Sequence, residues 1–245
     1  KFAKERCINI ALPGNKSLSL DIDKMRDVWF ETSYLFDVHQ VGKELAKERY
    51  TNYKKQPLQY SFPAGFTGKY NTPAERKHTA AIIREKGSNG DREMAWALYM
   101  AGFNVKDVHM TDLITGRETL EDVNMIVFVG GFSNADTLGS AKGWAGAFQY
   151  NEKAKKALEN FYSRKDTLSL GVCNGCQLMA ELGLITPAAR DLSPKMIHNN
   201  SHKYESAFVG VGIEESPSIM LRSLSGSKLG IWVAHGEGKF SFPAG

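Results

Sequence analysis

The feature of this sequence with the greatest consequence for its fold is an alternation of short apolar runs with helical patterns between residues 78 and 182. The strand candidates are the apolar runs Thr79–Ile83 and Met125–Val129 together with Phe103–Val108 and Thr167–Val172. Helical spacing follows residue 91, recurs from about 139 to 164 and recurs again from 175 to 182. A continuous apolar run is typical of a parallel strand that is buried on both faces. The sequence therefore predicts an α/β fold with a doubly wound, mostly parallel sheet.

The first 77 residues follow a different pattern. Ser17–Ile22 alternates polar and apolar residues as a half-buried strand does, and residues 24–49 have the apolar spacing of one long amphipathic helix. The next stretch is rich in Pro, Gly, Asn, Lys and Tyr without a sustained period, which is typical of a linker. We therefore expect three parts, which are residues 1–50, 51–77 and 78–245.

Charge and cysteine content exclude several classes of function. The 31 basic and 27 acidic residues among the 245 are interspersed and leave a formal net charge of +4, so we expect no nucleic-acid partner. No apolar stretch reaches the roughly 18 residues of a membrane span, so we expect no membrane partner. Three cysteines, Cys7, Cys173 and Cys176, are too few for a disulfide-stapled secreted domain and predict a reducing, cytoplasmic location.

The strongest local motif is Gly171-Val172-Cys173-Asn174-Gly175, where an apolar run ends and a helical pattern begins. The flanking glycines allow a sharp strand-turn-helix, the nucleophile elbow, from which a side chain projects at the top of the sheet. A helix start lowers a thiol pKa and offers N–H groups to an oxyanion. We therefore predict that Cys173 is a nucleophile and that Cys176 points into the packing. A redox or metal-binding Cys-x-x-Cys pair and two inert core cysteines remain open alternatives, although no second pair has zinc spacing.

Two further motifs are candidates for the same site. Gly130-Gly131 follows the most apolar run, where the backbone can present N–H groups to a ligand at the carboxyl edge of a parallel sheet. His235 and Glu237 follow a strand expected at 230–233, and their spacing would suit a base and its orienter beside a thiolate. Alternatively, they line a pocket or a surface turn. The same ambiguity applies to His198 and His202, and a further strand is expected at 207–213.

The turn Gly87–Asp91 is rich in glycine and polar residues, so it invites comparison with phosphate-binding loops. It lacks both Gly-x-x-x-x-Gly-Lys-Ser/Thr and Gly-x-Gly-x-x-Gly. We interpret it as a turn in which Ser88, Asn89 or Asp91 caps the following helix. We therefore expect no cofactor and no metal in this chain.

Four motifs together make the sequence familiar. They are Gly171–Gln177, Gly130–Ser133, His235–Gly238 and Arg84–Met94. Through them, residues 78–245 resemble the class I glutamine amidotransferase domain of the phosphoribosylformylglycinamidine synthase family. Residues 1–60, with the segment Met25–Tyr34, look like the tail of the large synthetase part of that family. The resemblance implies a class I glutaminase of flavodoxin-like α/β fold, preceded by a synthetase tail and a linker.

The resemblance also implies a division of labour in purine biosynthesis. Cys173 would attack the side-chain amide of glutamine, release ammonia and form a thioester that water hydrolyses. The implied oxyanion donors are the Asn174 N–H and an N–H of the Gly131–Phe132 turn, and Gln177 is an implied glutamine contact. The ammonia would pass to the synthetase part, which needs ATP and Mg²⁺ to convert formylglycinamide ribonucleotide to its amidine. That part is expected to lie outside this chain.

One departure from the family pattern concerns the base. The family's triad His and Glu lie in a His-Pro-Glu segment near the C-terminus, and these 245 residues contain no His-Pro-Glu. The resemblance therefore implies that His235 and Glu237 are pocket or interface residues, and that the sequence is a piece of a longer chain. Two other functions are kept as alternatives: a non-catalytic, glutaminase-like regulatory module, and a different cysteine hydrolase with the same elbow.

Overall fold

The computed structural model describes residues 5–55, 58–69, 73–186 and 192–243. The chain divides into two compact units on the basis of internal contacts. The first unit consists of residues 1–61, 201–203 and 208–232, and the second of residues 62–200, 204–207 and 233–245. The three parts expected from composition remain a prediction about the natural domain boundaries.

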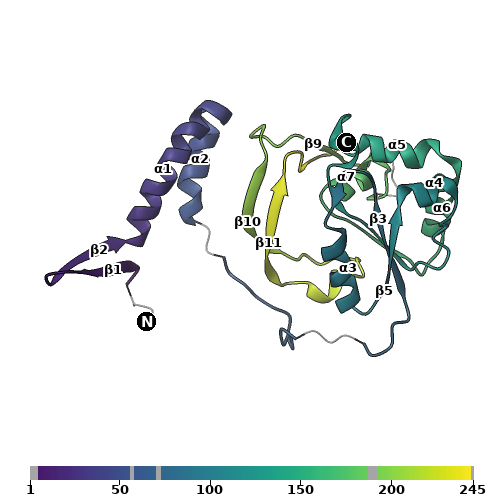
Figure 1. Cartoon of the computed structure of the whole chain (residues 1–245), viewed down its shortest axis with the longest axis horizontal. Helices are drawn as coiled ribbons and strands as arrows, with labels where there is room; N and C mark the ends of the chain where they lie inside the picture. The colour runs from purple at the N-terminus through teal and green to yellow at the C-terminus, as the bar shows by residue number, and fades with distance from the viewer. Residues whose placement is uncertain (1–4, 56–57, 70–72, 187–191, 244–245) are drawn as a thin grey trace. The chain divides into compact units, whose positions relative to one another are not determined.

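A four-stranded parallel sheet forms the centre of the second unit (Figure 1). Its strands are β3 (Thr79–Arg84), β5 (Asn104–His109), β6 (Met125–Phe128) and β8 (Leu168–Gly171), in the order β5-β3-β6-β8. Phe128 of β6 pairs with Ile83 of β3 and with Gly171 of β8. This register places the carboxyl ends of β6 and β8 side by side, which brings the Gly130-Gly131 and Cys173 motifs to one edge. The predicted α/β fold with a parallel sheet is confirmed.

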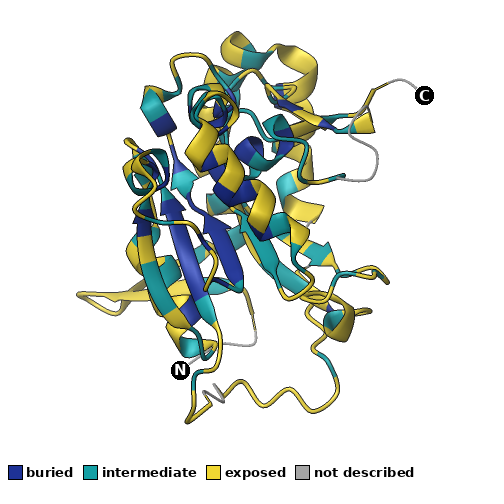
Figure 2. Ribbon diagram, turned by 90° about the vertical axis from the view of Figure 1, so that its right-hand side faces the viewer, coloured by how far each residue is buried: buried dark blue, intermediate teal, exposed yellow. Residues whose placement is uncertain are grey.

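Helices cover both faces of the sheet, because alternate strand residues point to opposite sides. On one face, Ile82 and Val127 pack with Leu98 of α3 (Asp91–Met100). On the other face, Ile83 and Phe128 belong to a larger buried cluster with residues of α4 (Met110–Thr115), α5 (Lys142–Tyr150), α6 (Glu152–Ser163) and α7 (Asn174–Glu181). Figure 2 shows the central strands as the most continuously buried part of the chain.

The remaining elements of the second unit are short. β4 (Ser88–Asn89) pairs antiparallel with β7 (Gly130–Gly131), and β9 (Lys195–Ile197) pairs antiparallel with β12 (Lys239–Ser241). The 3-10 segment η2 (Ser133–Asp136) follows β7. The β4–β7 pair therefore joins the glycine motif after β6 to the turn after β3.

The first unit contains a hairpin, two helices and most of a second strand pair. The hairpin strands are β1 (Cys7–Leu12) and β2 (Lys16–Asp21), followed by α1 (Ile22–Val41), α2 (Lys43–Asn52) and η1 (Tyr53–Lys55). β10 (Glu205–Gly212) pairs with β11 (Lys228–His235), and η4 (Arg222–Leu224) lies between them in sequence. β10 begins in the second unit and β11 ends there. No helix of the described residues is long and apolar enough to cross a membrane.

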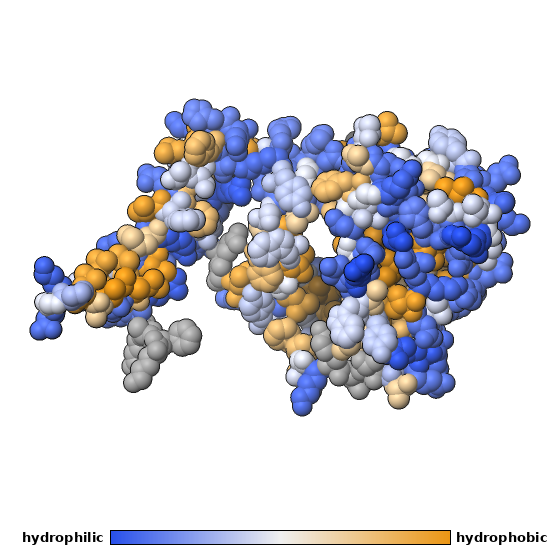
Figure 3. All heavy atoms as spheres, in the orientation of Figure 1, coloured by the Kyte–Doolittle hydropathy of each residue, from blue (hydrophilic) through white to orange (hydrophobic). Residues whose placement is uncertain are grey.

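α1 carries large apolar side chains but has no buried residue. Val28, Trp29 and Phe36 are 61%, 79% and 65% exposed. Figure 3 shows apolar side chains gathered over the β1–β2 hairpin, where Ile8 and Leu18 are also exposed. A continuous apolar surface of this kind is typical of a region that contacts other protein.

Two predicted helices are interrupted. The helix expected over 24–49 is divided into α1 and α2, because Gly42 has a φ of +87°, which an α-helix cannot continue through. The helical region expected from 139 to 164 is divided at Asn151, whose side-chain oxygen accepts the Ala154 N–H and caps α6.

The residue that caps the start of α3 in the structure differs from those predicted. The N-cap is Gly90, which makes no side-chain hydrogen bond, and not Ser88, Asn89 or Asp91. The Ser88 hydroxyl donates instead to the Glu85 carbonyl oxygen at 2.7 Å. The polar residues of this turn therefore stabilise the turn itself.

Candidate active site

Cys173 lies at the sharp turn between β8 and α7, where the elbow was expected. It is the N-cap of α7, with φ 55° and ψ −110°, a conformation that residues other than glycine rarely adopt. The turn depends on Gly175, because a Cβ there would lie 2.0 Å from the carbonyl oxygen of Phe128. This geometry presents the thiol at the carboxyl edge of the sheet, where ligands bind in open α/β folds.

The environment of Cys173 favours its thiolate form. Hydrogen bonding with His235 is the largest effect that lowers the pKa of Cys173, and the N–H groups of Gly131 and Asn174 lower it further, while burial opposes them. Cys176 differs, because burial and the neighbouring Cys173 charge raise its pKa. All three cysteines are free thiols. Cys173 is therefore the more nucleophilic member of the Cys-x-x-Cys pair at neutral pH.

The N–H groups of Gly131 and Asn174 both act on the Cys173 thiol by hydrogen bonding and lower its pKa. The neighbouring Phe132 N–H donates to the Gly87 carbonyl oxygen at 2.9 Å, and the Phe132 ring is exposed. Gly131 has a φ of +108° and no room for a side chain, since a Cβ would lie 2.7 Å from the Gly87 carbonyl oxygen. Of the three expected positions, the geometry thus offers Gly131 and Asn174 as N–H donors beside the sulfur.

A buried polar network joins α7 to the segments around it. Asn174, 1% exposed, accepts the Ser133 N–H through Oδ1 and donates through Nδ2 to Gln177 and Asp136. Gln177, 2% exposed, accepts that bond at 2.9 Å and donates through Nε2 to a Glu237 carboxylate oxygen at 3.1 Å. Both ends of the Gln177 amide therefore have protein partners, and its contact with glutamine remains a prediction.

His235 is the last residue of β11, and its ring lies beside Cys173. Hydrogen bonding with Cys173 is the largest effect on the pKa of His235 and raises it, burial lowers it, and the charges of Cys173 and Glu237 add to the rise. Nδ1 accepts the Glu237 N–H at 3.0 Å. The Glu237 carboxylate itself accepts hydrogen bonds from Ser140 and Gln177. His235 and Glu237 are thus both at the site, but the carboxylate does not orient the imidazole.

The other two candidate histidines are placed differently. His198 Nε2 lies 3.4 Å from a Glu237 oxygen, so it approaches the site through that carboxylate. His202 belongs to the first unit. Sequence reasoning did not select Ser133, Asp136 or Ser140, which hold the network together, because isolated polar residues in irregular segments carry no periodic signal.

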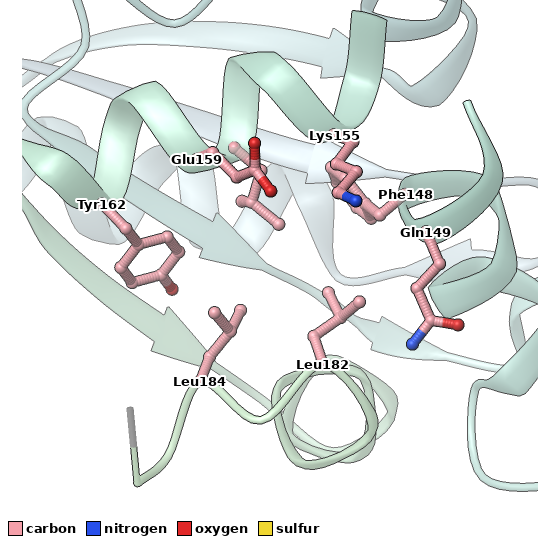
Figure 4. Close-up of a pocket in the computed structure, with 8 residues that line it drawn as sticks. Phe148, Gln149, Lys155, Glu159, Tyr162, Leu182 and Leu184 are labelled. Atoms are coloured by element: carbon pink, nitrogen blue, oxygen red, sulfur yellow. The ribbon is translucent and has the colours of Figure 1, made fainter. Parts of the chain in front are cut away.

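A separate pocket of about 250 Å³ lies near the opposite end of α7 (Figure 4). It is lined from α5, α6 and the segment after α7, by Phe148, Gln149, Lys155, Leu158, Glu159, Tyr162, Leu182 and Leu184. The lining contains neither cysteine nor histidine, so this pocket does not belong to the Cys173 site. Within the described ranges, no group of three His, Cys, Asp or Glu residues is arranged to hold a metal ion.

Comparison with known proteins agrees with this geometry. Residues 77–245 match the family model of the CobB/CobQ-like glutamine amidotransferase domain. The chain belongs to the CobB/CobQ-like glutamine amidotransferase family. The matched residues include the elbow cysteine Cys173 and the Gly130-Gly131 motif.

The relatives of this amidotransferase chain have consistent names. It is 43% identical over 96% of its length to the probable phosphoribosylformylglycinamidine synthase, chloroplastic/mitochondrial, of Arabidopsis thaliana. It is 40% identical over 96% of its length to phosphoribosylformylglycinamidine synthase of Homo sapiens. The chain spans only 17% and 19% of the length of these two proteins. The predicted resemblance is confirmed.

A solved structure supports the same fold assignment. PurLQS from Thermotoga maritima aligns with a TM-score of 0.56 and 26% sequence identity. The alignment covers 69% of this amidotransferase chain and 71% of that chain.

Proposed function

We propose that this chain is the glutaminase part of a phosphoribosylformylglycinamidine synthase and hydrolyses glutamine to glutamate and ammonia with Cys173 as the nucleophile. The observation that carries the proposal is the convergence of the Gly131 and Asn174 N–H groups on a thiol of lowered pKa. Family membership and the names of the relatives support the same class of reaction.

The proposed reaction passes through two tetrahedral intermediates. The Cys173 thiolate attacks the side-chain amide carbon of glutamine, and the Gly131 and Asn174 N–H groups bind the resulting oxyanion. The C–N bond then breaks as the nitrogen takes up a proton and leaves as ammonia, and a glutamyl thioester remains. Water attacks the thioester, glutamate leaves, and the thiolate re-forms.

The ammonia is consumed by a synthetase part of the natural protein, which in this proposal uses ATP and Mg²⁺ to form an amidine from formylglycinamide ribonucleotide. The exposed apolar surface of α1 supports the assignment of residues 1–50 to that part. Three free thiols favour a reducing compartment, for which we propose the cytoplasm. The name of the Arabidopsis relative assigns that protein to the chloroplast and mitochondrion.

Glutamate release from glutamine tests the proposal in the intact protein, with circular dichroism as a check on folding. Cys173→Ala should lose at least about 1,000-fold in turnover, because nothing else supplies the nucleophile. Cys176→Ala is the matched control and should keep most of the activity, since the pKa of that thiol is raised.

Labelling with a diazoketone analogue of glutamine distinguishes the alternatives. Modification of Cys173 by the analogue, blocked by glutamine, supports the glutaminase. Neither turnover nor labelling would identify a non-catalytic regulatory module. Labelling of Cys173 by unrelated electrophiles but not by the glutamine analogue would identify another kind of cysteine hydrolase.

A further inference from the structure

The Glu237 carboxylate lies in the turn between β11 and β12 and bonds to two other segments of the second unit. Its Oε2 accepts the Ser140 N–H and the Gln177 Nε2–H, each at 3.1 Å. The Ser140 hydroxyl lies 3.1 Å from the same oxygen and 3.1 Å from the Met196 carbonyl oxygen, so two acceptors share its single hydrogen. His198 Nε2 lies 3.4 Å from Oε1. One carboxylate oxygen therefore joins its own turn to α7 and to the segment before α5.

The segment before α5 has an unusual backbone conformation. Between residues 134 and 141, five residues other than glycine have a positive φ, from 47° to 58°. They are Asn134, Ala135, Asp136, Ser140 and Ala141. The left-handed region costs free energy for residues that carry a Cβ, so it persists only where surrounding contacts hold it.

The Asn174 side chain holds the start of this segment. Its Oδ1 accepts the Ser133 N–H at 3.0 Å, and its Nδ2 donates to Asp136 Oδ1 at 3.2 Å. The same Asp136 oxygen accepts the Ala141 N–H at 3.2 Å and closes the segment on itself. A single buried amide thus fixes residues 133–136 against the first turn of α7.

The Glu237 carboxylate holds the other end of the segment. Ser140 is 8% exposed, and both its N–H and its hydroxyl lie against Oε2 of Glu237. Gln177 links the two ends, because its Oε1 accepts from Asn174 at 2.9 Å while its Nε2 donates to Glu237. Segment 133–141 and α7 are therefore held together by one buried network with Glu237 at its outer end.

This segment follows directly on the glycine motif that packs against the nucleophile. A Cβ at Gly130 would lie 3.2 Å from the Cβ of Cys173 and 3.9 Å from its Sγ. Ser133 comes two residues after Gly131, so a displacement of segment 133–141 would displace the motif relative to the sulfur. Misplacement of a catalytic group by about 1 Å can slow a reaction about 100-fold.

We propose that Glu237 is a positioning residue, whose carboxylate holds segment 133–141 and so keeps the Gly130-Gly131 motif in place beside Cys173. The inference deepens the proposed function and rests on it. In this role the carboxylate serves as a hydrogen-bond acceptor, and its charge is not required. An oxyanion forms only after Cys173 has attacked, so a displaced N–H donor lowers kcat and leaves KM nearly unchanged.

The experiment combines two measurements on the intact protein. Glutamine hydrolysis gives kcat and KM, and amide hydrogen exchange, followed by mass spectrometry without glutamine, reports on peptides that cover residues 133–141. The wild type is compared with Glu237→Ala and with Glu237→Gln, which keeps an acceptor oxygen but not the charge. Glu118→Ala is the matched control, because Glu118 is a partly buried glutamate, 16% exposed, that bonds to Lys106 on β5 instead.

The expected result separates positioning from stability alone. Glu237→Ala should lower kcat by about 10- to 100-fold with KM changed by less than about 3-fold, and exchange in 133–141 should accelerate by about tenfold or more. Glu237→Gln should recover most of kcat and of the protection. Glu118→Ala should keep the wild-type kcat and the wild-type exchange of this segment.

Three results would overturn the inference. The first is a folded Glu237→Ala variant with wild-type kcat and exchange. The second is a Glu237→Gln variant whose KM rises about tenfold or more at unchanged kcat, since the carboxylate would then contact glutamine. The third, which needs no variant to fold, is rapid exchange of residues 133–141 in the wild type. If exchange responds as expected but the wild type releases no glutamate, only the proposed function is rejected.

Discussion

Gly175 is the residue on which the position of the nucleophile depends most directly. The first turn of α7 lies so close to β6 that a Cβ at this position would overlap the Phe128 carbonyl oxygen, 2.0 Å away. The same turn carries the Asn174 N–H, which acts on the Cys173 thiol by hydrogen bonding and lowers its pKa. A residue without a side chain therefore fixes the distance between the nucleophile and one of its donors.

Gly175→Ala should destabilise the protein by about 3 kcal/mol or more, because the overlap is with backbone that cannot rotate away. Gly146→Ala in α5 is the matched control: its Cβ would have its nearest neighbour, a Tyr150 ring atom, at 3.7 Å. The control should be neutral or more stable by about 0.5–1 kcal/mol, since alanine favours helix. Urea unfolding measures both, and equal stability of the two variants would contradict the packing argument.

Tyr162 predicts a pH dependence of stability. Burial raises its pKa to about 12 from an ordinary value of 10. Below pH 10 the Tyr162 hydroxyl keeps its proton in both the folded and the unfolded state, so the free energy of unfolding is at its full value. As the pH rises from 10 to 12, the unfolded state loses this proton first, and the free energy of unfolding falls. Tyr162→Phe should reduce this alkaline loss and cost little at pH 8, because the hydroxyl has no well-placed partner in the described chain. Tyr150→Phe, at a residue that is 88% exposed, should leave the loss unchanged.

Among the elements, α6 shows how a local signal sets a boundary. The Asn151 side chain accepts the Ala154 N–H at 3.0 Å and so separates α6 from α5. The buried face of α6 then packs against the sheet through Ala154, Leu158 and Phe161. The cap therefore sets where the buried face of the helix begins.

Asn151→Ala should lower the free energy of unfolding by about 1 kcal/mol through loss of the cap. Asn160→Ala lies in the same helix but on its exposed side. It should raise the free energy of unfolding by about 0.5 kcal/mol, because alanine has the higher helix propensity. Thermal unfolding of the two variants gives the comparison. The cap assignment is wrong if the two substitutions shift the melting temperature in the same direction.

Helices and strands whose residues follow a periodic or apolar pattern could be predicted from the sequence. Elements that depend on contacts between distant residues could not. The strands β3 and β6 are continuous apolar runs, and the elbow is indicated by the glycines around Cys173. The interruption at Gly42 was not predicted, because an isolated glycine in a helical pattern is compatible with either outcome. Two-residue strands such as β4 and β7 exist only through their pairing.

The candidate site likewise has residues that the sequence pattern locates and residues that only the structure places. Cys173 and the Gly131 region follow from strand ends, which sequence periodicity locates. The bond between Ser140 and Glu237 joins residues 97 positions apart, and no local pattern contains that information. The role of the Glu237 N–H at Nδ1 of His235 depends on a backbone direction, which side-chain identity does not report.

For the whole molecule, the contrast between the two units is the main feature. The second unit has a sheet buried on both faces, whereas α1 in the first unit has no buried residue. A helix with this many exposed apolar side chains gains little stability from its own unit, since helices in proteins are stabilised mainly by packing. The first unit is therefore expected to bind apolar probes or to self-associate when the 245-residue chain is isolated.

Replacing Val28, Trp29 and Phe36 with Lys, Gln and Gln should reduce the binding of a hydrophobic dye and the mass measured by light scattering. Glu31→Gln with Glu44→Gln changes exposed polar positions of α1 and α2 and should leave both readings unchanged. Dye binding that persists after the triple substitution would place the exposed apolar surface elsewhere.

The division into units has a consequence for how such a chain can be recombined. The boundary between the units is crossed at 61/62, 200/201, 203/204, 207/208 and 232/233, so β10 and β11 each belong partly to both. A single crossover between two related genes within residues 62–200 would therefore leave each unit with segments from both parents. The first unit would then combine the β1–β2 hairpin of one parent with most of the β10–β11 pair of the other.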